Sequence, residues 1–513
     1  MFKCLLLITA ALLAPAPAWA AWHEASSAHF VVYSDDKPER LKAFADRLER
    51  FDTAFRYWRG LPDPPVGNAN RLHIFVAPSM GAVQRLAGRN AQNIAGFYIG
   101  RASGPVAFVP RRTGGDANDL SAEAVFFHEY AHHLMLATYT GAFPAWLVEG
   151  FAEFHANVKF EPDGSVAFGL PPLYRAYGIF NQSSLPLARM LSGDYQRLSI
   201  DQVQALYGRG WLLTHLLSFE PARKTQLATY LRLINEGRSA AEAATIAFGD
   251  LGALDKELDR YANQRRLRYQ PIPASALKVP AVSVRALSPG EGALMPLRMR
   301  SIRGVSASNA AALIPPARKI AAAYQTNAVV QGWLAEMEYD ARNYDAAEAA
   351  ADRALAADPK NGQALVYKGR VRMARAIAAK TKEPAVWRDV RRWFVEASRV
   401  DSEDAEPKVL FHSTFAAAGI APTRNAVEAL LYAQQLVPQD TSLRMQVVHQ
   451  YMIDGKAEHA RRLLGPVAYN PHGGVGREWA AKIMAELTRN DTKAALARWD
   501  EAQAAMAGSE AGN

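Results

Sequence analysis

The sequence predicts an α+β protein, with a small mixed sheet and helices in its first half and an all-helical repeat array in its second half. Two observations carry this prediction. Short apolar runs bounded by turn residues alternate with helix-periodic segments before residue 110. Farther along the chain, alanines recur at a constant spacing inside helical patterns. The 513 residues are enough for about three domains at ~150 residues each, or for two large ones.

The strands and helices of the first half follow from these runs. Strands are expected over 28–34, 72–76, 96–99 and 106–109, the last as an edge strand, with a helix over 38–59. Asp119 or Ser121 is expected to cap a helix that runs to about Ala137. Pro144 suits the first turn of the next helix, and helical patterns continue to about Tyr269.

A proline-rich stretch, 271–280, predicts a linker, and an internal repeat follows it. Ala426, Ala460 and Ala494 lie 34 residues apart, the period of tetratricopeptide repeats. Ala347 is the equivalent position upstream, provided that an insertion of 11 residues lies near 380–389. The expected organisation is therefore a signal peptide (1–20), a first domain (21–270), a linker with a leading helical segment (271–318) and a repeat domain (319–508). A non-repetitive helical domain is the alternative for the last part.

The first twenty residues have the features of a secretory signal. Lys3 precedes an apolar run, Cys4 to Leu13, and Ala18-Trp19-Ala20 forms a small-x-small cleavage site. We therefore expect an exported protein, periplasmic or secreted. No later apolar run approaches the ~20 residues of a spanning helix, so no transmembrane segment is expected in the mature chain.

Composition excludes several classes of protein. Half of the residues are hydrophobic and 21% are charged, which excludes disorder and collagen. The only cysteine, Cys4, lies in the leader, so the mature chain has no disulfide and no thiolate site. The net charge is +9, but the basic residues form short scattered clusters rather than a stripe, and no nucleic-acid partner is expected.

The residues that indicate chemistry lie between 128 and 153. His128 and His132, at positions i and i+4 of the predicted helix, project from one face and can reach one metal ion. Glu129 borders that face and can hold a water molecule without binding the metal. A second helix folded back beside the first would bring Glu149 to the metal and leave a fourth position open. Glu153, one turn later, could then accept the other ring N–H of a histidine ligand.

His-Glu-x-x-His followed by Trp-Leu-x-Glu-Gly-x-Ala-Glu resembles the gluzincin metallopeptidases, the thermolysin-like and aminopeptidase-like clan. The resemblance implies a zincin-like fold over about residues 21–270 and a Zn²⁺ ion held by His128, His132 and Glu149. It also implies that Glu129 is the general base. Only 16 residues separate His132 from Glu149, a shorter gap than in the aminopeptidase family.

Two further comparisons with that clan bear on the reaction. Tyr207-Gly208-Arg209-Gly210 resembles the Tyr-x-x-Gly segment of the aminopeptidase-like families, which implies that Tyr207 stabilises the transition state. A tyrosine of a helical core is the alternative interpretation of Tyr207. The chain lacks the Gly-Ala-Met-Glu-Asn string that holds a substrate amino terminus in aminopeptidases, so an endopeptidase is favoured.

The sequence thus predicts an exported zinc-dependent peptidase that cleaves proteins or peptides. The polypeptide substrate is expected to lie extended against the strand at 106–109. The repeats, with no catalytic motif of their own, are expected to dock the substrate or an envelope protein partner. Residues 21–270 are expected to keep zinc binding and peptide cleavage without them. The alternative is a non-catalytic envelope scaffold with a degenerate zincin domain, which activity dependent on Glu129 would exclude.

Overall fold

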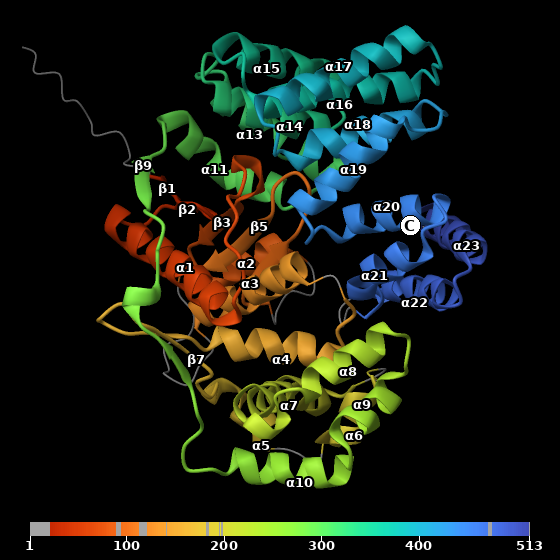
Figure 1. Cartoon of the computed structure of the whole chain (residues 1–513). Helices are drawn as coiled ribbons and strands as arrows, with labels where there is room; N and C mark the ends of the chain where they lie inside the picture. Colours follow the sequence, from red (N-terminus) through yellow and green to blue (C-terminus); the bar gives the residue numbers. More distant parts are fainter. Residues whose placement is uncertain are drawn as a thin grey trace, which may run out of the picture.

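The computed structural model describes residues 21–88, 94–111, 121–139, 141–180, 184–193, 195, 198–469 and 474–511. The predicted leader, 1–20, and Asp119 lie outside these ranges. The predicted fold class is confirmed at the level of α+β, since a small mixed sheet is surrounded by many helices (Figure 1). Within the described ranges, no helix combines the length and the apolar character needed to cross a bilayer.

The main sheet has six strands in the order β4-β5-β3-β2-β1-β9. Strands β2, β3 and β5 are parallel, and the other neighbours are antiparallel. All four predicted strands are present. The bounds are β1 His23–Ser26, β2 Phe30–Ser34, β3 Leu72–Ala77, β4 Phe97–Ile99, β5 Val106–Pro110 and β9 Ser283–Ala286.

The predicted edge strand was wrong. Strand β5, which contains residues 106–109, lies between β3 and β4, and the two edges are β4 and β9. The reason is the connection from β4 to β5, which folds β4 back antiparallel onto the side of β5 that would otherwise be free. The edge strand on that side of the sheet is therefore β4.

The stretch predicted as a linker is partly paired with the first half of the chain. Strand β8 (Gln270–Ile272) joins β6 (Lys159–Phe160) and β7 (Val166–Phe168) in a second, three-stranded sheet, and β9 pairs with β1. Pro271 is tolerated because β8 is an edge strand. These strands of two to four residues are too short for their periodicity to be recognised.

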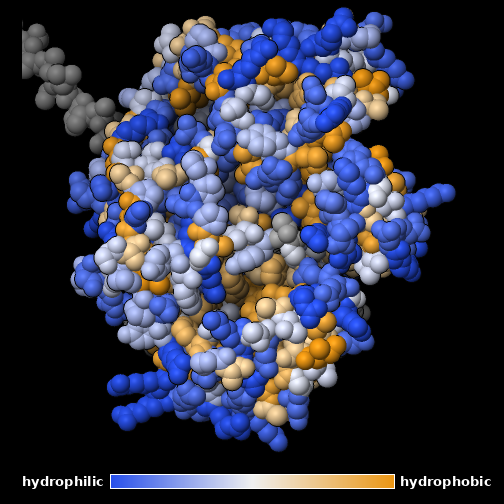
Figure 2. All heavy atoms as spheres, viewed as in Figure 1, coloured by the Kyte–Doolittle hydropathy of each residue, from blue (hydrophilic) through white to orange (hydrophobic). Residues whose placement is uncertain are grey.

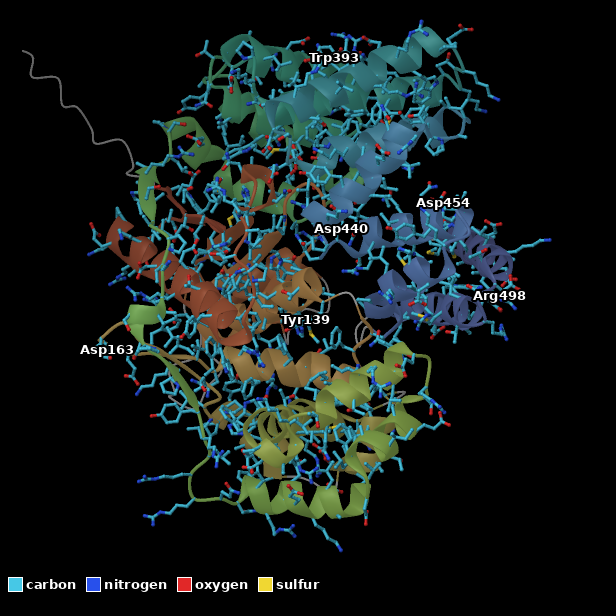
Figure 3. The ribbon with its side chains drawn as sticks, in the orientation of Figure 1. Tyr139, Asp163, Trp393, Asp440, Asp454 and Arg498 are labelled. Carbon is cyan, nitrogen blue, oxygen red and sulfur yellow. The ribbon has the colours of Figure 1, made fainter. Side chains whose placement is uncertain are left out.

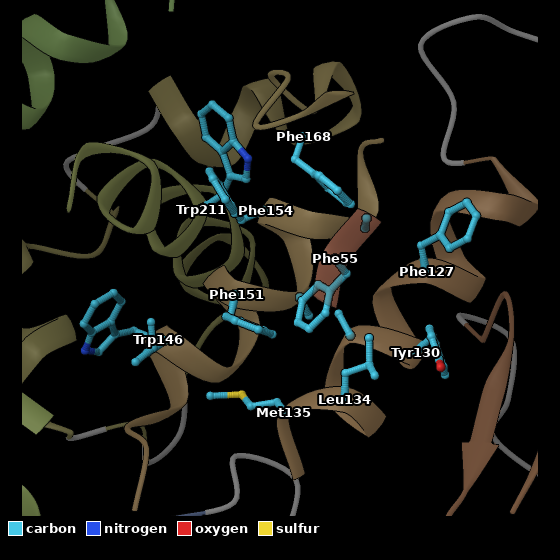
Figure 4. Packing of buried hydrophobic residues seen from close by; sticks show 14 of the residues in the cluster. Phe55, Phe127, Tyr130, Leu134, Met135, Trp146, Phe151, Phe154, Phe168 and Trp211 are labelled. Atoms are coloured by element: carbon cyan, nitrogen blue, oxygen red, sulfur yellow. The ribbon is translucent and has the colours of Figure 1, made fainter. Parts of the chain in front are cut away.

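The described chain before β8 also contains ten α-helices, and α1 has the predicted bounds. Ser121 caps α3 by accepting a hydrogen bond from the Ala124 amide, as expected. Aromatic side chains of α1, α3 and α4 form the core between them, among them Phe55, Phe127 and Phe151 (Figure 4). Phe51 of α1 stacks on Phe127, with ring centroids 4.3 Å apart. The helices are α1 Pro38–Arg59, α2 Met80–Ala87, α3 Ala122–Thr138, α4 Ala145–Ala156, α5 Ala176–Phe180, α6 Leu187–Ser192, α7 Ile200–Phe219, α8 Gln226–Asn235, α9 Ala240–Phe248 and α10 Leu251–Ala262.

The described chain after β9 is helical and forms an arc over the top and right of Figure 1. Three leading helices are followed by five successive helix pairs, in which each helix packs against the next. The helices are α11 Pro289–Ile302, α12 Ala307–Ala311, α13 Ile314–Ala321, α14 Ala328–Asp340, α15 Tyr344–Ala357, α16 Gly362–Ala378, α17 Pro384–Val400, α18 Ala405–Ala417, α19 Arg424–Leu436, α20 Thr441–Ile453, α21 Ala457–Ala468, α22 Gly474–Thr488 and α23 Thr492–Ala511. We call α14–α23 the helical array.

The periodic alanines occupy the second helix of a pair. Ala347, Ala426 and Ala460 are fully buried, whereas in the last pair Ala495, one residue after Ala494, takes the buried position. The extra residues predicted near 380–389 are spread over a whole pair, because α16 and α17 have 17 residues each against 13 in α14.

The leading helices and the start of the array complete the core of the sheet. One face of the sheet packs on α1 and α3, and the alternate residues Val31, Tyr33, Phe75 and Phe108 point to the other face. Side chains of α11, α13 and α14, among them Leu294 and Ala317, cover that second face. The two halves of the chain therefore share a hydrophobic core.

A buried histidine ties the start of β2 to α1 and gives a first testable prediction. His29 Nδ1 lies 2.8 Å from Glu49 Oε2, and Nε2 lies 2.9 Å from Asp63 Oδ1. Burial alone would lower the pKa of His29, but Glu49, Asp52 and Asp63 raise it to about 9. Since the folded pKa exceeds the unfolded value, this stabilisation is complete below pH ~6.5 and is lost as the pH rises through 9.

We expect the free energy of unfolding of the wild type to lose on the order of 2 kcal/mol relative to His29→Gln between pH 6 and pH 9.5. Urea unfolding of both proteins across this range measures the difference. A gap between the two proteins that does not change with pH would show that His29 is not charged in the folded state.

Candidate metal centre

Two adjacent helices bring together the three predicted metal ligands. His128 and His132 lie one turn apart on α3, and Glu149 lies on α4, which packs against α3. His128 Nε2 is 3.1 Å from His132 Nε2 and 3.4 Å from Glu149 Oε2, and His132 Nε2 is 3.8 Å from the same oxygen. Two ring nitrogens and one carboxylate oxygen thus converge on one point.

These residues fit a zinc ion in both spacing and chemistry. Ligand atoms placed ~2.0–2.2 Å from a tetrahedral zinc lie ~3.3–3.6 Å from one another, close to the three separations observed. Two imidazoles and a carboxylate are also the donors of hydrolytic zinc sites with one open position. Glu149 is fully buried, and a buried carboxylate requires a cationic partner, which the ion would supply.

A second described group of three potential ligands, His29, Asp52 and Asp63, is less suitable. Arg56 Nε lies 2.6 Å from Asp52 Oδ2 and 3.6 Å from Asp63 Oδ1. The guanidinium already supplies the positive charge that an ion would bring, so this group is explained as a buried charge network.

Glu153 lies behind His128 and fixes its orientation. Its Oε1 is 3.2 Å from His128 Nδ1, and it accepts hydrogen bonds from Arg175 Nε at 3.0 Å and Nη2 at 2.6 Å. The Tyr174 hydroxyl donates to the other oxygen at 3.0 Å. Burial would raise the pKa of Glu153, but His128 and Arg175 lower it to about 2, so the carboxylate stays ionised. It therefore holds His128 with Nε2 directed at Glu149 and His132.

The electrostatics of His128 reflect the two carboxylates around it. Burial disfavours the imidazolium, yet hydrogen bonds and charges from Glu149 and Glu153 raise the pKa of His128 to about 10. A metal ion bound at His128 Nε2 would take the place of the proton that these carboxylates stabilise on the ring.

Glu129, the predicted base, follows His128 on α3. Glu129 and His133 are four residues apart on α3 and therefore share a face of this helix. His133 Nδ1 lies 2.8 Å from the hydroxyl of Tyr98 in β4, so this face of α3 is directed at the edge strand.

Tyr207 reaches the site through a close crossing of two helices. A Cβ atom on Gly150 of α4 would overlap the Gly210 carbonyl of α7, and one on Gly210 would lie 2.6 Å from the Trp146 oxygen. Glycine at both positions lets the two backbones touch. The crossing stacks the Tyr207 ring on His128, with centroids 6.0 Å apart and planes 19° apart.

The Tyr207 hydroxyl is hydrogen-bonded to Glu149, and the Arg175 guanidinium lies 4.6 Å from the centre of its ring. Burial and the charge of Glu149 raise the pKa of Tyr207 above its usual value, so the hydroxyl keeps its proton and can donate it in a hydrogen bond. Tyr207 is thus a neighbour of His128 and Glu149 as well as a part of the helix packing.

Tyr207→Phe is expected to lower kcat for peptide hydrolysis by ~10²-fold, with zinc content and thermal stability near wild type. The reason is the loss of one hydrogen-bond donor beside the reacting carbonyl. Tyr177→Phe, which changes an exposed tyrosine on α5, is the matched control. A large fall in melting temperature with unchanged activity per folded molecule would assign Tyr207 to the core.

Sequence reasoning missed the residues that support the ligands. Arg175 and Tyr174 lie in a short helical turn before α5, more than twenty residues after Glu153, and no motif marks them. His133 Nδ1 lies 2.8 Å from the Tyr98 hydroxyl, which links α3 to β4. Only the glycine in Trp-Leu-x-Glu-Gly carried a signal, because glycine inside a helix often marks a close approach.

In comparisons with known proteins, no family model matches the chain, and no curated protein sequence matches it significantly.

Proposed function

We propose that the protein is an exported zinc-dependent peptidase, most suited to internal peptide bonds. The observation that carries the proposal is the convergence of His128, His132 and Glu149 within 4.8 Å of one another, with Glu129 next to the first ligand. This donor set suits hydrolysis by an activated water molecule. The leader predicted at residues 1–20 supports the part of the proposal that concerns export.

The arrangement of elements supports a zincin-like fold for the first half. The helix with the two histidines contacts β4 and β5, and β4 is an antiparallel edge strand. Within the described chain β4 pairs with β5 alone, so its outer edge can pair with the backbone of an extended substrate. Five successive helix pairs, three of which bury a periodic alanine (Ala347, Ala426 and Ala460) in their second helix, support tetratricopeptide-type repeats in the second half.

Each polar residue of the site then has a task. Bound zinc would acidify a water molecule and polarise the scissile carbonyl. Glu129 accepts the proton that this water loses and passes it to the leaving amine. Tyr207 donates a hydrogen bond to the oxygen on which negative charge develops. Glu153, held by Arg175, keeps His128 in the orientation that binding requires.

Zinc content and hydrolysis measured on the same preparation test the proposal. The purified full-length chain is expected to hold one zinc ion and to cleave a casein-like substrate. A chelator should abolish cleavage, and added zinc should restore it. The proposal fails if the protein binds no zinc, or if cleavage survives complete removal of the metal.

A further inference from the structure

A pocket of about 280 Å³ lies beside His132, between the first half of the chain and the helical array. Its walls from the first half are apolar and include Met135 and Tyr139 on or next to α3 and Phe143 and Val148 on or before α4. In the space-filling view, hydrophobic residues gather in a hollow in the middle of this face (Figure 2). Because His132 lines the pocket, the pocket opens at the metal centre.

The remaining wall belongs to the helical array. Gln439 and Thr441 at the start of α20 and Pro466 in α21 line the pocket from the far side. Figure 3 labels Tyr139 and Asp440, which come from these two facing sides. Residues separated by some 300 positions in the sequence thus form one cavity.

Three contacts fix the start of α20 against the site. Asp440 Oδ2 accepts a hydrogen bond from the Ala102 amide at 2.7 Å, in the connection between β4 and β5. A Cβ atom on Gly100, just after β4, would lie 2.8 Å from the Gln439 carbonyl oxygen. Arg444, fully buried, donates to the Leu136 carbonyl near the end of α3 at 3.2 Å. The array therefore touches both the edge strand and the histidine helix.

We infer that this pocket selects a large apolar side chain of the polypeptide substrate, and that Thr441 and Gln439 of the helical array are specificity-determining residues. The inference rests on the proposed peptidase function and adds the substrate feature that the site recognises. A substrate extended along β4 runs toward Gly100 and Gln439, which brings its side chains to the mouth of the pocket.

The chemistry of the walls sets the class of side chain. Apart from His132, every side chain that lines the pocket is uncharged. A charged substrate side chain would lose its hydration without gaining a partner there, whereas an apolar one is transferred out of water. The volume is at the lower limit for small-molecule pockets, ~300–1,000 Å³, and suits one side chain such as that of leucine or phenylalanine.

The helical array would then form part of the substrate pocket itself rather than a remote docking module. A substitution on α20, far along the chain from the proposed metal ligands, would therefore change which peptides are cleaved. Thr441→Phe fills the pocket from the array side. Ser442→Phe is the matched control, because Ser442 is the next residue of the same helix turn, is exposed and does not line the pocket.

The experiment uses the full chain and a series of peptides that differ at one position, with leucine, phenylalanine, alanine, glycine or aspartate next to the cleaved bond. The wild type and Ser442→Phe are expected to favour leucine or phenylalanine over glycine by ~10-fold or more in kcat/KM. Thr441→Phe is expected to lose that preference, because kcat/KM falls on the leucine and phenylalanine peptides. Thr441→Leu, a smaller change, should give an intermediate preference.

Peptide binding separates this inference from the proposed function. Fluorescence anisotropy of the labelled peptides on zinc-loaded Glu129→Gln protein, with and without Thr441→Phe, should show the same preference and its loss. Binding with this pattern but without hydrolysis by the wild type would refute the peptidase and support the pocket. Hydrolysis or binding with no apolar preference, or equal effects of Thr441→Phe and Ser442→Phe, would overturn the pocket and leave the peptidase standing.

Discussion

Glu129→Gln is expected to lower peptide hydrolysis by ~10²-fold or more while zinc stays bound. The substitution removes the proton acceptor and leaves His128, His132 and Glu149 unchanged. His132→Ala is expected to have the opposite pattern, with loss of the metal itself, because two ligands hold zinc far less tightly than three. Activity falls in both variants, but zinc content separates them.

Zinc analysis and initial rates on the same protein samples distinguish the proposed proton acceptor, Glu129, from the proposed metal ligand, His132. Glu123→Gln is the matched control, since it makes the same change on the same helix and disturbs only a surface pair with Arg47. Such a pair contributes ~0–1 kcal/mol to the free energy of unfolding, so activity and zinc content should both stay near wild type. Wild-type hydrolysis by Glu129→Gln protein would refute the proposed role of Glu129.

Local spacing was sufficient to predict that His128, His132 and Glu149 lie together, but not which residues support them. His128 and His132 share a face of α3 because of helix geometry alone. The connection from α3 to α4 is short, which places α4 beside α3. The contacts of Glu153 with Arg175 and Tyr174, in contrast, depend on how the chain after β7 returns to α4. No motif or periodicity near Tyr174 and Arg175 predicts this course of the chain.

Four of the six strands of the main sheet were predicted, but β1, β9 and the strand order were not. Residues 97–99 and 106–110 both have apolar runs, and a run does not show which strand lies outside the other. The outer position of β4 depends on tertiary structure, because β4 pairs antiparallel with the free side of β5. In the same way, the pairing of β9 with β1 joins residues more than 250 positions apart, which periodicity cannot reveal.

The shared core also changes what is expected of a shortened chain. The separation of motifs and repeats in the sequence predicts that residues 21–270 retain the metal site alone. In the structure, a chain that ends at residue 270 lacks β9 and the helices α11, α13 and α14 that cover one face of the sheet. We therefore expect such a chain to lose cooperative folding and, with it, stable zinc binding.

The size of the effect follows from the side chains that would be exposed. Val31, Tyr33, Phe75, Val106 and Phe108 are buried against those helices. At about 2 kcal/mol for each large side chain, their exposure costs on the order of 10 kcal/mol. A folded protein is stable by only ~5–15 kcal/mol in total, so this loss is comparable with the whole stability.

A chain that ends at residue 469 is the control for this truncation. It lacks α22 and α23 but keeps β9, the cover of the sheet and the pocket residues Gln439, Thr441 and Pro466. Thermal unfolding followed by circular dichroism should show a cooperative transition for this chain, at a lower temperature than for the full chain, and none for the chain ending at 270. A cooperative transition and bound zinc in the shorter chain would mean that the first half forms its core without the helices after β9.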